Sequence, residues 1–202
     1  MLKIFVQKNT KIKKTGFTLV EALVAISILM IAIASPMLLA QKSLSSATLS
    51  KDQMIASFLA QDAIETIRNI RDQIAVNPNG GSSDWLALLK DCYCTTTDKC
   101  DLNDLSKSEY CVLDTTTGTV YSKDPVKNPL KISYTNDGEN NFTKYDYVGA
   151  ENSKFSRYIN IQMNPYGNKD EAIVNVKVSW EAPAGTQSID IQDFLYNYSE
   201  NY

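Results

Sequence analysis

The stretch KKTGFTLVEALVAISILMIAIASPMLLAQK, residues 13–42, decides the fold of this 202-residue chain. Between Thr15 and Gln41 it contains a single charged residue, Glu21, and residues 22–40 are almost purely apolar. This length is close to the roughly 20 residues that an α-helix needs to cross a bilayer. Because lysines and no acid precede the run, the positive-inside rule keeps the N-terminus in the cytoplasm. We therefore expect a single-pass membrane helix over residues 17–41.

Glu21 is the unusual residue of this run, because a carboxylate in an apolar environment is costly and usually functional. Two ordinary interpretations compete for the segment. One is a cleaved secretory signal, since Ala32, Ile33 and Ala34 have the small-x-small form of a cleavage site, although the apolar run continues beyond it. The other is a plain signal anchor, in which Glu21 lies at the membrane edge. Neither interpretation gives the acid a function.

The sequence GFTLVE, residues 16–21, resembles the processing site of type IV pilins and of the pseudopilins of type II secretion. The resemblance includes the basic leader, Gly16, Phe17, the acid at its spacing and the long apolar helix. It implies that a prepilin peptidase removes the leader, residues 1–16, and that Phe17 becomes the N-methylated first residue. The implied partner of Glu21 is the N-terminal amine of an adjacent subunit. An unpaired carboxylate in a dry filament core would cost several kcal/mol, so Glu21 would set the axial register.

The same resemblance implies the partners and the location of the chain. Before assembly the helix lies in membrane lipid, with the leader in the cytoplasm and the head outside the cytoplasmic membrane. The implied partners are other pilin subunits, the prepilin peptidase and an inner-membrane assembly platform, and the final location is an extracellular or periplasmic filament. One departure concerns Pro36, where a helix kink is expected: many major pilins have a glycine nearby, and this chain does not.

The apolar helix is expected to continue as an amphipathic helix over residues 42–76. Apolar residues recur there every three or four positions, and no Gly or Pro interrupts the pattern. The predicted stripe consists of Ile55, Leu59, Ala63, Ile67, Ile70 and Ile74, widened by Phe58 and Ile64. The charged residues expected on a solvated face are Glu65, Arg68, Arg71 and Asp72. The segment LAQDAIETIRNIRD, residues 59–72, resembles minor pilins and minor pseudopilins, which favours a minor subunit.

Residues 77–202 are predicted to form an α+β head in which the long helix packs on a small antiparallel sheet, a type IV pilin-like fold. The apolar period of two indicates half-buried antiparallel strands. The strand candidates are YCVLD and TVYS joined through TTTG, then LKISYT, RYINIQMN, AIVNVKVSW and SIDIQDFLYNY. In the last of these, Phe194, Tyr196 and Tyr198 share one face, which we expect to pack on the sheet or on a neighbouring subunit.

A short helix is expected before the strands, in SSDWLALLKDC, residues 82–92. Ser83 or Asp84 is the expected N-cap. The residues expected to be buried are Trp85, Leu88 and Leu89.

Four cysteines, Cys92, Cys94, Cys100 and Cys111, define an insert, residues 91–111, on the side of the membrane where disulfides persist. They allow three pairings. A bridge between Cys92 and Cys94 would close a strained ring, so each of these two is expected to pair with Cys100 or Cys111. A four-cysteine zinc site is the weaker alternative, because pairs with two intervening residues are missing. No metal site is therefore predicted.

The composition disfavours several functions. The sequence has no histidine, which removes the commonest general base and transition-metal ligand, and we recognise no phosphate loop or pair of catalytic acids. Without the leader, 15 basic and 23 acidic residues leave a net charge of −8, which disfavours nucleic acid as a partner. We therefore expect no enzyme activity and no cofactor.

The function predicted from these features is that of a minor structural subunit of a type IV pilus or a related filament. Two alternatives remain open. One is a filament-tip binding module, or adhesin, displayed through the cysteine-rich insert. The other is a pseudopilus subunit of type II protein secretion.

Overall fold

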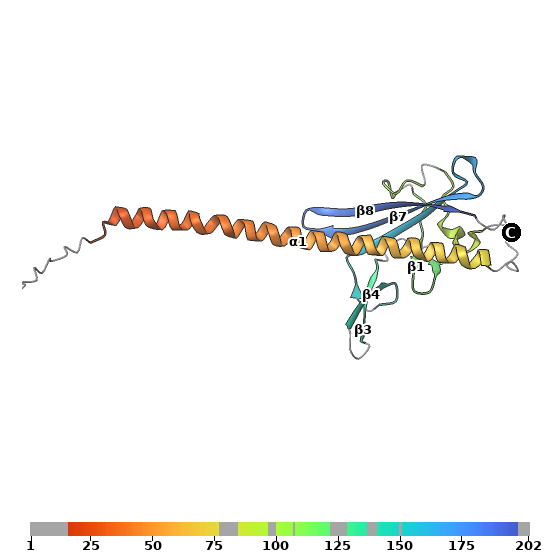
Figure 1. Cartoon of the computed structure of the whole chain (residues 1–202), viewed down its shortest axis with the longest axis horizontal. Coiled ribbons are helices and arrows are strands. Elements are labelled where there is room, and N and C mark those ends of the chain that lie inside the picture. The colour runs from red at the N-terminus through yellow and green to blue at the C-terminus, as the bar shows by residue number, and fades with distance from the viewer. Residues whose placement is uncertain are drawn as a thin grey trace, which may run out of the picture. The chain divides into compact units, whose positions relative to one another are not determined.

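The computed structural model describes residues 16–76, 85–96, 100–106, 108–121, 129–136, 141–149 and 151–197. It divides into two compact units, Met1–Thr48 and Leu49–Tyr202. Figure 1 shows the order of the elements along the chain. Most of the expected leader lies outside the described residues, as does Tyr198. Ser83 and Asp84 lie outside them too, and the prediction that one of them is the N-cap is wrong, because Leu86 precedes the short helix as its N-cap.

One α-helix, α1 (Leu19–Val76), accounts for both predicted helical segments. Thr18 caps it, since its Oγ1 accepts a hydrogen bond from the backbone N–H of Glu21 at 3.3 Å. The acid in the first turn is also favourable at the positive end of the helix dipole. Pro36 lies inside the helix, which continues through it as one element, so the kink expected there stays a prediction.

In the first unit every described side chain is exposed, from Gly16 to Thr48. The exposed fractions of Leu19 and Ile31 are 79% and 70%. By length and composition the helix is apolar enough to cross a membrane, with a mean hydropathy of 2.5 in its most apolar window. Lipid or other helices are needed to cover an apolar surface of this length.

In the second unit the apolar stripe of α1 is buried. The predicted positions Leu59, Ala63, Ile64, Ile67 and Ile70 are confirmed as buried, while Ile55 and Ile74 are half-buried. Two small residues complete the contact surface, Ala56 and Ala60, both fully buried. Because a methyl group is the whole side chain, the helix backbone approaches the sheet closely at these positions.

The prediction that Phe58 widens this stripe is wrong, because its exposed fraction is 63%. Phe58 is two residues from both Ala56 and Ala60, and each residue turns an α-helix by about 100°. Its side chain therefore points to the side of α1 opposite the buried alanines.

The main sheet has three antiparallel strands in the order β6, β7 and β8. These are β6 (Phe155–Met163), β7 (Glu171–Ala182) and β8 (Gly185–Tyr196). Figure 1 shows β7 and β8 beside the part of α1 that follows Leu49. The alternation predicted for β7 is confirmed, since Val174, Val176, Val178 and Trp180 are buried in the common core with α1 and the residues between them are half-buried. In β6 the predicted Ile159 and Ile161 also lie in this core, but the half-buried alternation is wrong, because Tyr158 and Asn160 on the other face are buried as well. The α+β architecture is therefore as expected.

Two smaller sheets complete the head. The predicted hairpin is present as β1 (Val112–Asp114) paired with β2 (Thr119–Tyr121). A three-stranded sheet has the order β4, β3 and β5, formed by β3 (Lys131–Asn136), β4 (Asn141–Asp146) and β5 (Glu151–Asn152). Of these, only β3 is anticipated from the sequence.

The short helix before the strands is a 3₁₀ helix, η2 (Ala87–Cys92), and a second one, η4 (Pro165–Gly167), follows β6. Trp85 and Leu89 are buried as predicted, but Leu88 is 65% exposed. A 3₁₀ helix has three residues per turn, so Leu86 and Leu89 lie on one face and Leu88 does not. The register of the tighter helix thus overturns the prediction for Leu88.

Candidate functional site

The predicted processing residues lie immediately before α1. Gly16, Phe17 and Thr18 have no regular secondary structure, and Phe17 is 79% exposed. No heavy atom lies within 4 Å of the point where a Cβ on Gly16 would stand. The peptide bond between Gly16 and Phe17 therefore lies outside the hydrogen-bonded helix and is accessible to a peptidase.

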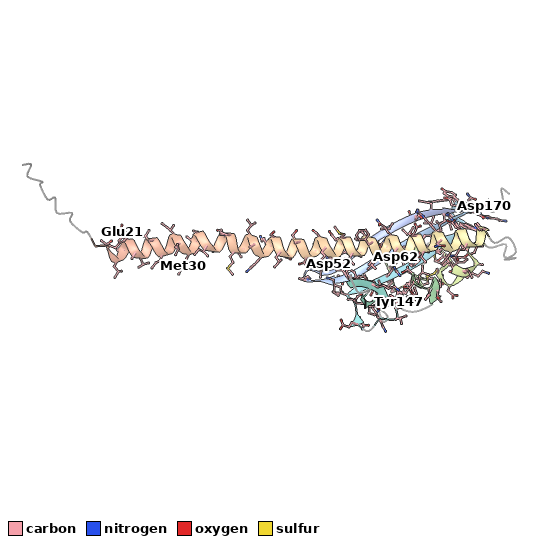
Figure 2. The ribbon with its side chains drawn as sticks, turned by 60° about the horizontal axis from the view of Figure 1, so that its bottom comes forward. Glu21, Met30, Asp52, Asp62, Tyr147 and Asp170 are labelled. Carbon is pink, nitrogen blue, oxygen red and sulfur yellow. A yellow bond between two sulfur atoms is a disulfide. The ribbon has the colours of Figure 1, made fainter. Side chains whose placement is uncertain are left out.

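Glu21 lies in the first turn of α1, as Figure 2 shows. Among the described residues its carboxylate has no hydrogen-bond or ion-pair partner. The hydroxyls further along the apolar segment are satisfied within the helix itself, because Ser27 donates to the carbonyl of Leu23 at 2.8 Å and Ser35 to that of Ile31 at 3.5 Å. The Glu21 carboxylate is thus exposed and makes no side-chain contact of this kind within the described segment.

A buried arginine joins three elements of the head. Arg157 on β6 is 1% exposed. Its Nη1 donates to the carbonyl of Leu59 on α1 at 3.0 Å and to Oδ2 of Asp62 at 3.3 Å, and its Nη2 donates to the carbonyl of Leu113 on β1 at 2.7 Å. The guanidinium therefore fixes the positions of α1, β1 and the main sheet relative to one another within the head.

Tyr147 also lies close to this arginine. Its hydroxyl is buried and has no hydrogen-bond partner among the described residues. Burial raises the pKa of the Tyr147 phenol, and the nearby charge of Arg157 opposes the shift without cancelling it. The phenol is thus held in its neutral form.

Two further ion pairs attach α1 to the sheet. Arg68 binds Asp193 on β8 through two hydrogen bonds of 3.0 Å, which corrects the expectation that Arg68 is merely solvated. The bonds to Asp193 raise the pKa of the Arg68 guanidinium further. At the other end of the contact, Lys154 lies 2.6 Å from Oδ2 of the buried Asp52. The helix is therefore held at several levels along its length.

The four cysteines form two disulfides, Cys92–Cys111 and Cys94–Cys100. This pairing agrees with the expectation that Cys92 and Cys94 each bond to Cys100 or Cys111 and not to each other. It leaves no cysteine thiolate for the alternative zinc site. The insert is also attached to the sheet, since the backbone N–H groups of Cys94 and Cys111 donate to the carbonyls of Ile161 and Ile159 on β6. The insert thereby covers the β6 edge of the main sheet.

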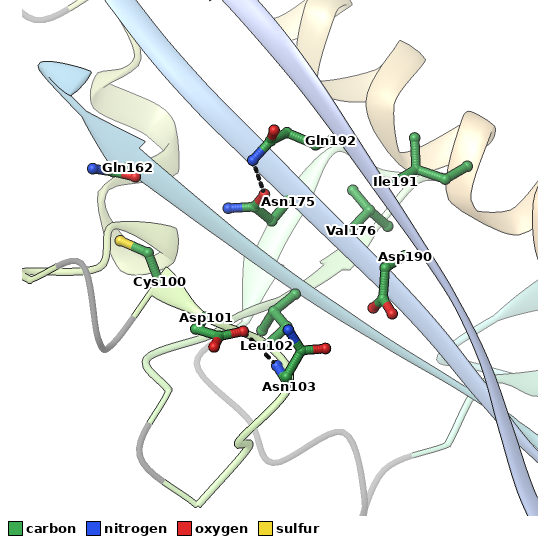
Figure 3. A pocket seen from close by; sticks show the side chains of 10 residues that line it. All are labelled: Cys100, Asp101, Leu102, Asn103, Gln162, Asn175, Val176, Asp190, Ile191 and Gln192. Carbon is green, nitrogen blue, oxygen red and sulfur yellow. Dashed lines mark hydrogen bonds between the residues drawn. The ribbon is translucent and has the colours of Figure 1, made fainter. Parts of the chain in front are cut away.

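A groove of about 380 Å³ lies where this insert meets the outer face of the main sheet (Figure 3). Val174 and Val176 on β7 point into the core with α1, so Asn175 between them points to the opposite face. The lining side chains include Asp101, Asn103, Gln162, Asn175, Asp190 and Gln192. Atoms of Leu102, Val176 and Ile191 also line the groove, which thus presents polar side chains beside apolar surface on the side of the sheet that α1 does not cover.

The sequence analysis did not identify Arg157 or the cluster of strand amides beside the groove, Gln162, Asn175 and Gln192. A signal for Arg157 was present, because it stands in phase with the inward-facing Phe155 and Ile159 on β6. The amide cluster is harder to predict from the sequence, because its residues come from three different strands. Only the register of these strands brings them together.

The comparisons with known proteins concern the N-terminal segment. Residues 11–35 match the family model of the prokaryotic N-terminal methylation motif, which is typical of type IV pilins and pseudopilins. No curated protein and no solved structure shows a significant match to the chain. The motif supports a pilin-like prepilin that is processed by a peptidase, and this family is structural rather than enzymatic. With the apolar helix, it fits a single-pass membrane anchor.

Proposed function

We propose that this chain is the prepilin of a minor subunit of a type IV pilus or a related pseudopilus. The match of residues 11–35 to the methylation motif is the observation that carries the proposal. Within it, cleavage after Gly16 removes residues 1–16, and Phe17 becomes the N-methylated first residue. The exposed, non-helical backbone around Gly16 supports this site of cleavage.

Assembly follows from the exposed apolar surface of the first unit. Lipid covers this surface before assembly, and the helices of other subunits cover it in the filament core. In that core the carboxylate of Glu21 pairs with the N-terminal amine of a neighbouring subunit. A subunit placed out of register leaves both charges unpaired, which costs several kcal/mol in an apolar environment and so selects the correct position.

The orientation follows from the lysines before the motif. They keep the leader in the cytoplasm, and the head then stands outside the cytoplasmic membrane. Two disulfides in the head suit that oxidising side. The partners in this scheme are the prepilin peptidase, the inner-membrane assembly platform and other pilin subunits.

Mass spectrometry of the intact chain and of its N-terminal peptide tests the proposal, on protein from native membranes and from sheared filaments. We expect a chain that begins at Phe17 with one added methyl group. The Glu21→Gln variant should show the same processed mass in membranes and be depleted at least tenfold in filaments, because it keeps the cleavage site and loses the charge.

Three other results would contradict this scheme. A chain that begins at Ser35 indicates a secreted protein, and one that keeps Met1 indicates a plain anchor. Normal incorporation of the Glu21→Gln variant would remove the proposed register function of the acid.

A further inference from the structure

The groove between the insert and β8 presents hydrogen-bonding groups that assembly through α1 leaves unused. Figure 3 shows amides from all three strands of the main sheet around it, Gln162, Asn175 and Gln192, together with Asp101 and Asn103 of the insert. Its volume of about 380 Å³ falls within the range of roughly 300 to 1,000 Å³ that small-molecule sites occupy. We propose that this groove binds a neutral polyhydroxylated ligand, such as a short segment of an oligosaccharide.

Three amides linked across the strands form a ladder beside the groove. Asn160 is fully buried, donates to the carbonyl of Cys100 at 2.9 Å and accepts from Asn175 at 3.0 Å. Asn175 in turn accepts at Oδ1 from Nε2 of Gln192 at 2.9 Å. The three residues are direct neighbours in the register of β6, β7 and β8. Because Asn160 fixes the direction of each bond, the ladder is already ordered and a ligand need not order it.

The ladder leaves hydrogen-bonding capacity that faces the groove. Gln192 keeps its Oε1 acceptor and a second N–H, and Gln162 has no hydrogen-bond partner among the described residues. Asp190 adds an acceptor carboxylate at the rim. An amide offers a donor beside an acceptor, and each hydroxyl of a sugar both donates and accepts. The set of groups thus matches neighbouring hydroxyls.

An aromatic side chain adjoins these amides. Phe194 follows Gln192 by two residues on β8 and so points to the same face of the strand, where it is 43% exposed. Tyr196 continues the row and is 46% exposed. A sugar ring has polar edges and a face of C–H groups, and that face packs on an aromatic ring. The combination of amides and an exposed ring suits a sugar better than a wholly polar or wholly apolar ligand.

The charges around the groove disfavour ionic ligands. Asp101 and Asp190 repel anions, and Lys177 is already engaged, because its Nζ donates to the carbonyl of Leu102 at 3.0 Å and lies 3.6 Å from Asp190. In the described part of the chain, no group of three or more His, Cys, Asp or Glu side chains is placed to hold a metal ion. A neutral ligand is therefore favoured over an anion or a metal ion.

The location of the groove suits display, a point that rests on the proposed function. Within the head, α1 packs on one face of the main sheet and the groove lies on the other. Because α1 occupies only the opposite face, it leaves the groove uncovered in a displayed head, where polymers in the surroundings are able to reach it.

The test is isothermal titration calorimetry on the full unassembled chain in micelles of a phosphocholine detergent, which has no sugar headgroup. The probes are the neutral hexasaccharides maltohexaose, cellohexaose, hexa-N-acetylchitohexaose and mannohexaose. Hexagalacturonate and an uncharged Gly-Ser-Asn peptide are the comparison ligands. We expect saturable binding of at least one neutral hexasaccharide, at least tenfold tighter than that of either comparison ligand.

Four variants locate the binding site. Gln192→Ala and Phe194→Ala should each weaken binding about tenfold, as losses at a small interface do. The matched controls are Gln187→Ala and Phe58→Ala. The Gln187 side-chain amide donates to the carbonyls of Gly185 and Thr186 at the start of β8, and Phe58 is an exposed ring on α1. Both controls should bind as wild type does, and circular dichroism verifies that all four fold.

The proposal is overturned if no neutral hexasaccharide binds, if the peptide or hexagalacturonate binds best, or if folded Gln192→Ala and Phe194→Ala bind as tightly as the controls. Since the chain is unassembled in this experiment, these outcomes are independent of whether it enters a filament.

Discussion

At the scale of single residues, Arg157 connects three elements of the head, β6, α1 and β1, although no sequence motif marks it. Its guanidinium lies among apolar side chains, and the two Nη groups donate to carbonyls of α1 and β1. Replacing Arg157 with Met keeps much of the volume and removes the donors. We expect this change to lower the free energy of unfolding by about 2 to 4 kcal/mol, because the buried carbonyl of Leu113 loses a charged partner.

Urea unfolding followed by tryptophan fluorescence measures this loss, since Trp85 and Trp180 are both buried in the head. Arg157→Lys keeps the charge without the forked donors and should fall between wild type and Arg157→Met. Lys169→Met, at an exposed position, is the control and should change little. A loss below about 0.5 kcal/mol in Arg157→Met would show that the arginine is dispensable.

The phenol of Tyr147 predicts a pH dependence at alkaline pH. Burial raises its pKa in the folded protein above that in the unfolded chain, which is about 10. The folded state therefore favours the protonated phenol, whose contribution is complete below pH 10 and is lost as the pH rises above it. We expect the slope of stability against pH between 10 and 11 to be shallower in Tyr147→Phe, by up to about 1.4 kcal/mol per pH unit.

Urea titrations at pH 7, 9, 10 and 11 measure that slope. At pH 7 the Tyr147→Phe variant should be at least as stable as wild type, because it removes a buried hydroxyl that has no hydrogen-bond partner among the described residues. Equal slopes in the two proteins would show that the phenol does not titrate in this window.

Alternation along a strand locates the residues that motif reading misses. Asp193 stands in phase with Ile189, Ile191 and Leu195 on β8, just as Arg157 stands in phase with apolar residues on β6. A charge at an inward position needs a partner in the core, and here both partners lie on α1. The need for a partner can be predicted from the sequence, but the identity of the partner cannot, because it depends on how the helix lies on the sheet.

At the scale of elements, the two disulfides make different contributions to the stability of the insert. Cys92–Cys111 closes a sequence separation of 19 and Cys94–Cys100 one of 6. The chain-entropy relation gives about 3.3 kcal/mol for the first and about 2.4 kcal/mol for the second. We expect the Cys92→Ala/Cys111→Ala variant to be less stable than the Cys94→Ala/Cys100→Ala variant by about 1 kcal/mol.

Urea unfolding of the two double variants measures the difference, and wild type treated with dithiothreitol should lose more than either. A larger loss from the short loop than from the long one would show that native contacts, rather than loop closure, dominate.

The elements divide into those that periodicity predicts and those that it does not. α1 and the strands β6 to β8 have long, regular patterns, and the sequence is sufficient to locate them. The sequence of β4, NFTKYD, has little apolar alternation, so this strand was missed even though it pairs with β3 along its whole length. The placement of the insert on β6 was not predictable either, because it depends on backbone hydrogen bonds from Cys94 and Cys111 to Ile161 and Ile159, which residue spacing does not reveal.

At the scale of the whole molecule, the chain contains one unit whose apolar surface is exposed and one with a core of its own. The N-terminal motif makes the first unit predictable, since the match at residues 11–35 and the lone acid define it together. The head has no such motif. Its groove depends on strand register, on disulfide pairing and on one buried asparagine, and none of these is readable from residue spacing alone.

The attachment of α1 to the sheet also has a mechanical consequence. Asp52, Leu59 and Arg68 of the helix bind Lys154, Arg157 and Asp193, so the contacts are spread along the helix axis. A pull along that axis, as in a filament under tension, stretches these contacts at the same time. Loaded in shear, they share the force, whereas peeling would break them one after another. The contacts between α1 and the sheet therefore resist a force applied along the helix axis.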